Sequence, residues 1–195
     1  MLCSCIQAQK VKFGLEQHLG LSTYTRGLLP FDLKLSSSTG LIVGMALSDR
    51  IKLRSGLYFH STGANNKVSY GYPLYQTDVI QTVAQSCLRL PLFLNVRIGK
   101  KKRFSMEAGG YFNYFIQYKI STDSNDYPYD GGGMWVDLEL DQHDFGIIIR
   151  QEIAKSLYNV GISIGLQEEI GLNPLARGTV QVGTSAFITI TFYEP

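Results

Sequence analysis

Charged residues are scarce in this 195-residue chain: Asp, Glu, Lys and Arg make up 17% of it, against roughly 25% in soluble domains. Of its three cysteines, two lie close together at the start of the chain. If these two are removed by cleavage after Ala8, the remaining Cys87 can form neither an internal disulfide nor a cysteine-based metal site. The net charge is only +2 and the basic residues form no stripe, which argues against a nucleic-acid partner.

Long hydrophobic runs are also absent. No stretch approaches the ~18 consecutive apolar residues of a membrane-spanning helix. This excludes a helical membrane protein but not a membrane β-barrel, whose strands alternate between apolar and polar side chains. Glycine and aromatic residues are plentiful, with 20 Gly, 12 Tyr and 10 Phe. The length suits one domain or one closed barrel rather than two domains.

Apolar side chains alternate with other residues in eight segments of the chain. These segments are 11–24, 39–48, 51–60, 88–98, 104–119, 144–153, 158–167 and 179–192. In the fourth, for example, Leu88, Leu90 and Leu92 share one face, and Arg89 and Asn95 lie on the other. A helix would repeat its apolar positions every three to four residues, so the segments are strands. Several exceed the roughly five or six residues of a globular strand and reach the ~9–11 of a membrane-crossing one.

The connections between these segments alternate in length. They are short after the second, fourth and sixth segments. The long ones are 26–38, 63–85, 121–142 and 170–178. Outer-membrane barrels have tight periplasmic turns and extended outer loops. The sequence therefore predicts an all-β fold: a single eight-stranded antiparallel up-and-down transmembrane β-barrel, with long extracellular loops and both chain ends in the periplasm.

The two faces of the strands differ in a way that predicts their orientation. One face is apolar throughout, whereas the other combines charges with glycines and aromatics, which suits a crowded interior. An eight-stranded barrel is just wide enough for side chains to fill it. Buried charges need partners of opposite sign. We expect a side-chain-filled lumen with a structural network of Lys12, Glu16, Lys52, Arg54, Arg89, Arg97, Glu107, Asp144, Arg150 and Glu152.

Two groups of chemically active residues have either a functional or a purely structural interpretation. His60 and His143 lie near the outer ends of their strands, where they could contribute to a catalytic site at the barrel rim. Such a site is defined by the three-dimensional arrangement of its residues, which their spacing in the sequence does not show. Asp123, Asp126 and Asp130 share the third long connection but lack the pattern of a calcium-binding loop. We therefore expect no catalytic, cofactor-binding or metal-binding residue, no cofactor and no enzymatic activity.

The first residues look like the end of an export signal. Ile6-Gln7-Ala8 fits a small-residue cleavage site, which makes residues 1–8 the remnant of a signal peptide and 9–195 the barrel domain. Two alternatives stay open. Cys5 would be acylated in a lipoprotein, and a cytosolic protein would begin with a disordered segment.

Three segments resemble the PorT-like small outer-membrane barrels of Bacteroidetes. They are Leu88-Arg89-Leu90-Pro91-Leu92-Phe93-Leu94, Phe104-Ser105-Met106-Glu107-Ala108-Gly109-Gly110-Tyr111 and Asp144-Phe145-Gly146. The resemblance implies the same fold and a location in the outer membrane of a Gram-negative-type cell. Because some members of that group support a secretion system, it also implies a structural or interaction role connected with secretion.

The predicted partners follow from this picture. They are outer-membrane lipid, a possible protein at the extracellular loops, and the barrel-assembly machinery, which would recognise the aromatic Phe192 near the end of the last strand. One alternative function is a soluble, lipocalin-like ligand-binding barrel with its apolar face inward. A second is a lipid-modifying enzyme with its site at the barrel rim.

Overall fold

The computed structural model describes residues 11–26, 29–30, 32–72, 75–99, 103–123, 143–157, 160–172 and 179–192. The strands are β1 (Val11–Arg26), β2 (Leu29–Pro30), β3 (Lys34–Ala46), β4 (Ile51–Tyr72), β5 (Tyr75–Ile98), β6 (Phe104–Asp123), β7 (His143–Leu157), β8 (Val160–Gly171) and β9 (Thr179–Phe192). Within these ranges, no helix has the length and apolar character needed to cross a membrane.

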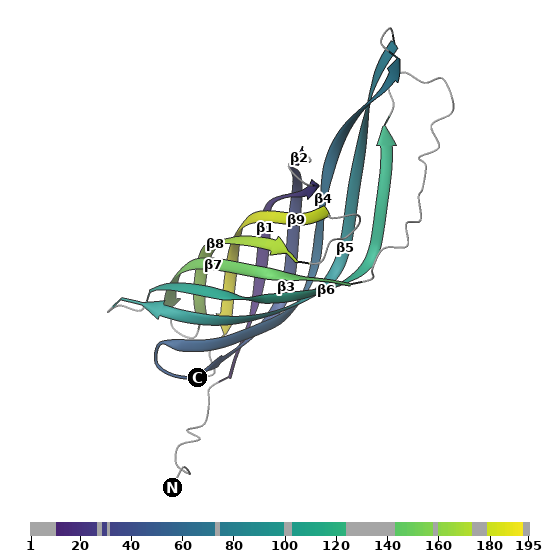
Figure 1. Cartoon of the computed structure of the whole chain (residues 1–195). Helices are drawn as coiled ribbons and strands as arrows, with labels where there is room; N and C mark the ends of the chain where they lie inside the picture. Colours follow the sequence, from purple (N-terminus) through teal and green to yellow (C-terminus); the bar gives the residue numbers. More distant parts are fainter. Residues whose placement is uncertain are drawn as a thin grey trace.

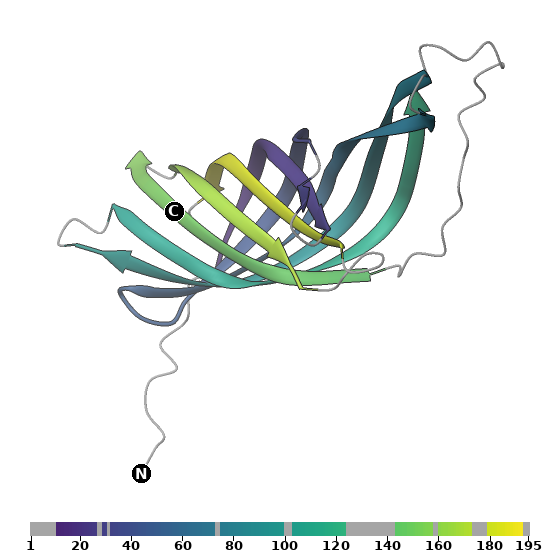
Figure 2. The same cartoon turned by 45° about the horizontal axis from the view of Figure 1, so that its top comes forward.

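Eight of the strands form a closed antiparallel barrel (Figures 1 and 2). Neighbours in sequence pair in the order β1-β3-β4-β5-β6-β7-β8-β9, and β1 pairs with β9 to close the ring. The closing ladder runs from Phe13 opposite Phe192 to Arg26 opposite Thr179. The two-residue strand β2 adds only a short pairing to the far end of β1. The predicted eight-stranded up-and-down barrel is therefore confirmed.

Most side chains on the outside of the barrel are apolar, whereas the inside holds most of the buried charges together with polar groups and aromatic rings. Phe13 and Leu41 are each 62% exposed and Leu92 is 55% exposed, whereas Glu107 and Arg150 are each 1% exposed. A soluble ligand-binding barrel would bury these leucines and expose its charged side chains to water, so this alternative is wrong. Exposed leucines, isoleucines and phenylalanines on every strand instead suit contact with hydrocarbon.

The segment 63–85 departs from the prediction. It was expected to be a long loop, but β4 continues to Tyr72 and β5 starts at Tyr75, and the two strands pair along the whole length. β6 follows β5 up to the pairing of Ile80 with Asp123. Figure 1 shows these three strands rising beyond the rest of the barrel. Outside a membrane a hairpin needs no long apolar face, and the alternation here is short, with Val68, Tyr70 and Tyr72 on one side of the strand.

Smaller differences occur at the ends of other strands. Residues 34–38 belong to β3 rather than to the first long connection, and β8 continues to Gly171. The ladder between β5 and β6 shifts register at Ser86 and Cys87, where the alternation of β6 slips by one residue. Predictions about residues 1–10, Tyr158 and most of the last two long connections lie outside the described residues.

Candidate functional site

The lumen holds aromatic rings beside glycines on the neighbouring strand. Gly40 pairs with Tyr58, and Gly165 pairs with Phe187. A β-carbon on Gly165 would lie 2.5 Å from the ring of Phe187 and 2.2 Å from the carbonyl oxygen of Gln151. Glycine at these positions lets a buried ring lie flat against the barrel wall. The mixture of glycines and aromatics on the charged face therefore has a packing cause.

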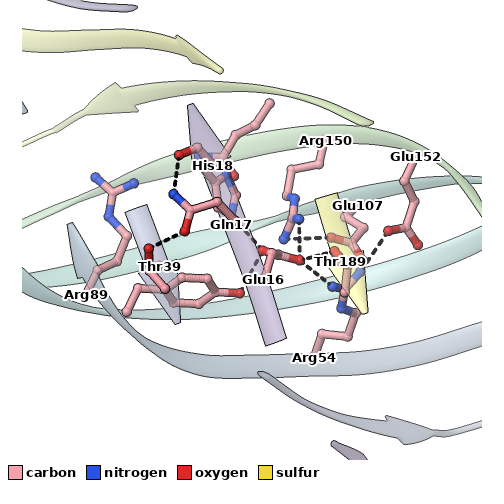
Figure 3. A network of polar contacts seen from close by, with 12 residues as sticks. Glu16, Gln17, His18, Thr39, Arg54, Arg89, Glu107, Arg150, Glu152 and Thr189 are labelled. Atoms are coloured by element: carbon pink, nitrogen blue, oxygen red, sulfur yellow. Dashed lines mark hydrogen bonds and ion pairs between the residues drawn. The ribbon is translucent and has the colours of Figure 1, made fainter. Parts of the chain in front are cut away.

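Arg54 on β4 forms the centre of an inner cluster of ion pairs (Figure 3). Its guanidinium donates to Glu16 Oε2 at 2.8 Å, to Glu152 Oε2 at 3.0 Å, and to Glu107 Oε1. These acids come from β1, β7 and β6, so one side chain links four strands across the barrel. Because Arg54 and its partners are all buried, the pairing removes the large cost of isolating any of these charges from water.

A second arginine, Arg150 on β7, completes this cluster. Its Nη2 lies 2.8 Å from Glu16 Oε2, and its Nη1 lies 3.2 Å from Glu107 Oε2. The guanidinium carbon lies 3.9 Å from the ring centroid of Phe187 and 4.9 Å from that of Phe93. Two arginines therefore share Glu16 and Glu107, and the rings on either side of Arg150 stabilise its charge.

Neutral groups complete the coordination of Glu16. Tyr58 donates its hydroxyl to Glu16 Oε1 at 2.8 Å, and Thr189 donates to the other oxygen. His18 Nε2 lies 2.7 Å from Oε1. His18 is buried, as expected for a histidine on the interior face.

Glu152 has a similar set of donors, closer to the end of the barrel where β1 begins and β9 ends. Ser105 donates to its Oε1 at 2.9 Å and Asn95 donates to the same oxygen at 3.2 Å, while Ser163 donates to Oε2 at 3.1 Å. Asn95 also donates to Glu107 at 2.8 Å. The amide therefore joins two carboxylates that would otherwise repel each other.

An outer cluster surrounds Arg89 on β5. Both terminal nitrogens of its guanidinium bond the carboxylate of Glu169 on β8, and its Nε donates to Asn113 at 2.8 Å. Asn113 and Tyr111 in turn donate to Asp144 Oδ2 at 3.4 Å. A two-bond arginine–carboxylate pair has strict geometry and stands among the strongest protein hydrogen bonds.

The structure separates the ten predicted network residues into three groups. Five of them form the inner cluster: Glu16, Arg54, Glu107, Arg150 and Glu152. Arg89 and Asp144 lie in the outer cluster. Lys12, Lys52 and Arg97 line a cavity at the end of the barrel where β1 begins and β9 ends.

Sequence reasoning missed Glu169, the main partner of Arg89. The predicted strand ended at 167, although extending its alternation from Gly165 through Gln167 places Glu169 on the interior face. It also missed the amides Asn95, Asn113 and Gln181, which are buried and bonded. The alternation shows which face they occupy, but only the three-dimensional register shows which charges they contact.

Over residues 7–183 the sequence matches the family described as "Outer membrane protein beta-barrel domain". The chain belongs to this family. Together with an apolar exterior and a charged, buried interior, the match makes the chain an integral barrel protein of the outer membrane, surrounded by lipid. Among curated proteins, none matches the sequence.

Several solved structures align with this family member over most of their length. One is Ail, the attachment invasion locus protein of Yersinia pestis, in complex with the heparin analogue sucrose octasulfate, with 9% identity, a TM-score of 0.44, and coverage of 94% of this chain and 99% of that one. Neisserial surface protein A is 12% identical, with a TM-score of 0.44 and coverage of 91% and 96%. The N-terminal barrel domain of Pseudomonas aeruginosa OprF is 10% identical, with a TM-score of 0.35 and coverage of 92% and 97%.

The histidines of this outer-membrane barrel do not meet at its rim. His60 is buried in the lumen, with its Nε2 3.8 Å from Glu169 Oε1. His143 is exposed and stacks on the outward-facing ring of Phe112, with the ring centroids 6.1 Å apart. The two imidazoles lie on opposite sides of the barrel wall, so a catalytic site that uses both is excluded.

Within the described residues, no group of three or more His, Cys, Asp or Glu side chains lies close enough together to hold a metal ion. Asp126 and Asp130, two of the three aspartates considered above as calcium ligands, lie outside the described residues.

Proposed function

We propose that this outer-membrane barrel is a closed structural or interaction protein that presents an extended β projection to a partner outside the cell. The projection is the part of β4, β5 and β6 beyond the barrel wall. What supports the proposal is its pairing: β3 leaves β4 after Ser61, and β7 leaves β6 after Tyr114, yet β4 and β5 continue to Tyr72 and Tyr75. A bridge between Asp32 and Asn65 is the last pairing that we find on this side of β4 within the described residues. At ~3.3 Å per residue, the part of β4 beyond Asn65 extends about 23 Å.

The filled lumen argues against a transport function. Arg54 and Arg150 form ion pairs inside the lumen with buried carboxylates from several strands. Opening a path would require separating these charges inside the barrel. We expect reconstituted protein in planar bilayers to show no steady conductance. A large, stable conductance would contradict a closed lumen.

Photo-crosslinking in intact cells tests the interaction role. A photoreactive residue replaces Ser69 on the projection and, as a control, Leu92 on the lipid-facing wall. The proposal predicts a discrete protein adduct at Ser69 and only lipid adducts at Leu92. Scanning positions 66–72 and 75–80 without finding any protein adduct would overturn it.

We further infer a PorT-like subgroup and a secretion-related role within the family. In support, the two main resembling segments lie side by side on β5 and β6, where Leu94 pairs with Ala108 and Asn95 with Glu107. Deleting the gene should then block export of the cargo of one secretion system while leaving other outer-membrane traffic intact. Normal export in the deletion strain would refute the role.

The lipid-facing end of β9 carries a feature that the barrel-assembly machinery could recognise. Phe192 is 50% exposed on the outer wall and pairs with Phe13 across the closing seam. We expect the barrel-assembly machinery to recognise this aromatic. Phe192→Ala should slow membrane insertion in cells, measured by the fraction of heat-modifiable barrel, whereas Phe112→Ala on the same outer face should not. Equal insertion of the two variants would count against recognition.

A further inference from the structure

The cavity at the short-turn end of the barrel is rich in positive charge. The short-turn end is the end where β1 begins, β9 ends and the tight connection 47–50 lies. Among the described residues that line the cavity, four are cationic and one is anionic. The cations are Lys12, Lys52, Arg54 and Arg97, and the anion is Glu152.

The anionic lining residue already has its partners. Glu152 accepts bonds from Arg54, Ser105 and Ser163, and Arg54 is engaged by Glu16 and Glu107 as well. The charged groups that act on the Lys52 ammonium are Arg97, Lys12, Arg54 and Glu152, so cations predominate there. Lys52 and Arg97 therefore lie at the rim of the cavity, outside the inner cluster.

The register explains why these cations converge. Lys52 is the second residue of β4 and Arg97 the last but one of β5, so both lie one step inside the barrel mouth on the interior face. Both are half-buried, in contrast to the fully buried Arg54 below them. Charges of one sign in a concave, partly desolvated mouth focus their field on whatever enters it.

Small residues beside the cations leave room for a ligand. Gly44, Ala46, Ala154 and Gly161 line the cavity, which has a volume of about 70 Å³. A bound water needs roughly 10–15 Å³ of free volume, so the cavity has space for the four oxygens of a tetrahedral anion. A β-carbon on Gly44 would lie 3.5 Å from Arg54 Cγ and 3.9 Å from the carbonyl oxygen of Leu53, which are ordinary contact distances, so the wall at this position has room.

We infer that the mouth formed by Lys12, Lys52 and Arg97 binds a phosphate group. A guanidinium offers paired donors that match the oxygens of phosphate, and the two ammonium groups supply compact positive charge. A phosphate dianion would offset the mutual repulsion of Lys52 and Arg97. The inference concerns a ligand site at the end opposite to the projection and does not depend on the proposed interaction role.

Titration of the refolded full-length protein with inorganic phosphate tests the site. The detergent is an uncharged alkyl glucoside, because phosphocholine detergents carry the competing group, and sodium chloride holds the ionic strength constant. Calorimetry should show saturable binding of one phosphate. Lys52→Met and Arg97→Gln should each weaken binding at least tenfold. Lys155→Met is the matched control, because Lys155 lies near the same end of β7 but points outward, and it should bind as the wild type does.

A further variant distinguishes binding inside the cavity from nonspecific attraction of phosphate to a positively charged surface. Ala46→Leu leaves every charge in place but fills the space beside Lys52, its partner across β3 and β4, and should also weaken binding at least tenfold. The heat-modifiable gel shift verifies that each variant is folded. Absence of saturable binding to the wild type would overturn the inference. So would unchanged binding by Ala46→Leu, or equal weakening by Lys155→Met and Lys52→Met.

The source of the phosphate group is then identified by competition. Phosphatidylglycerol is added to the micelles and phosphatidylcholine serves as the reference lipid. Displacement of inorganic phosphate by phosphatidylglycerol alone supports a site for a lipid headgroup that reaches around the rim. Undiminished phosphate binding in both lipids supports a site for a soluble phosphate compound.

Discussion

Arg89 and Glu169 lie eighty positions apart in the chain, yet they form a two-bond ion pair across the lumen, with one of the bonds 3.1 Å long. They come from β5 and β8, which are not neighbours in the barrel wall. The pair therefore holds opposite walls together at the outer part of the lumen, as Arg54 does closer to the short-turn end.

A double-mutant cycle on this pair measures its contribution. Arg89→Met leaves a buried carboxylate without its cation, and Glu169→Gln leaves a buried guanidinium without its anion, so each should cost about 3–5 kcal/mol of unfolding free energy. The double variant should cost less than the sum by about 0.5–3 kcal/mol. Equilibrium urea unfolding in lipid vesicles gives these values, and strict additivity would show that the two side chains do not interact.

Removing Glu107 tests the inner cluster. Glu107→Ala leaves Arg54 and Arg150 sharing fewer carboxylates in a buried site, which should lower the unfolding free energy by about 3–5 kcal/mol. The unfolding temperature, followed by loss of the heat-modifiable band, should fall accordingly. Glu168→Ala is the control, because Glu168 is an exposed acid on the outer side of β8. If both variants melt alike, Glu107 does not stabilise the barrel from inside.

The barrel itself could be predicted from the sequence because lipid imposes a strict rule on it. Every membrane-crossing strand needs an apolar side chain at alternate positions, and positions such as Leu90 and Ile149 follow that rule. The projection obeys no such rule, so the strand character of 63–85 was missed. The network partners were also missed in part, because the pairing of Arg89 with Glu169 depends on barrel closure and strand stagger rather than on any local pattern.

The glycines beside lumen aromatics provide a packing test. At Gly165 a β-carbon would collide with the backbone of Gln151 and the ring of Phe187, so Gly165→Val should cost about 1–3 kcal/mol of unfolding free energy. Gly110→Ala serves as the control, since its nearest neighbour would lie 3.4 Å away. Equal stability of the two variants would mean that the ring of Phe187 does not lie against the wall as described.

A charge placed on the outer wall tests the surrounding solvent. Leu92→Arg puts a cation on the apolar face and should cost about 2–4 kcal/mol of folding free energy in vesicles if the position lies near the middle of the bilayer. Asp49→Arg, in an exposed turn at the short-turn end, should change stability much less. A Leu92→Arg variant as stable as the wild type would mean that this surface does not contact hydrocarbon.

Quenching of a single tryptophan by brominated lipid tests the orientation of the strands most directly. Tyr111 is 4% exposed and the next residue, Phe112, is 42% exposed, so two adjacent aromatics point to opposite sides of β6. With the one native tryptophan replaced by Trp135→Phe, Phe112→Trp should be quenched strongly in vesicles of brominated lipid, and Tyr111→Trp should be nearly unaffected. Strong quenching of Tyr111→Trp with a protected Phe112→Trp would contradict a barrel that faces lipid with its apolar side and encloses its charges.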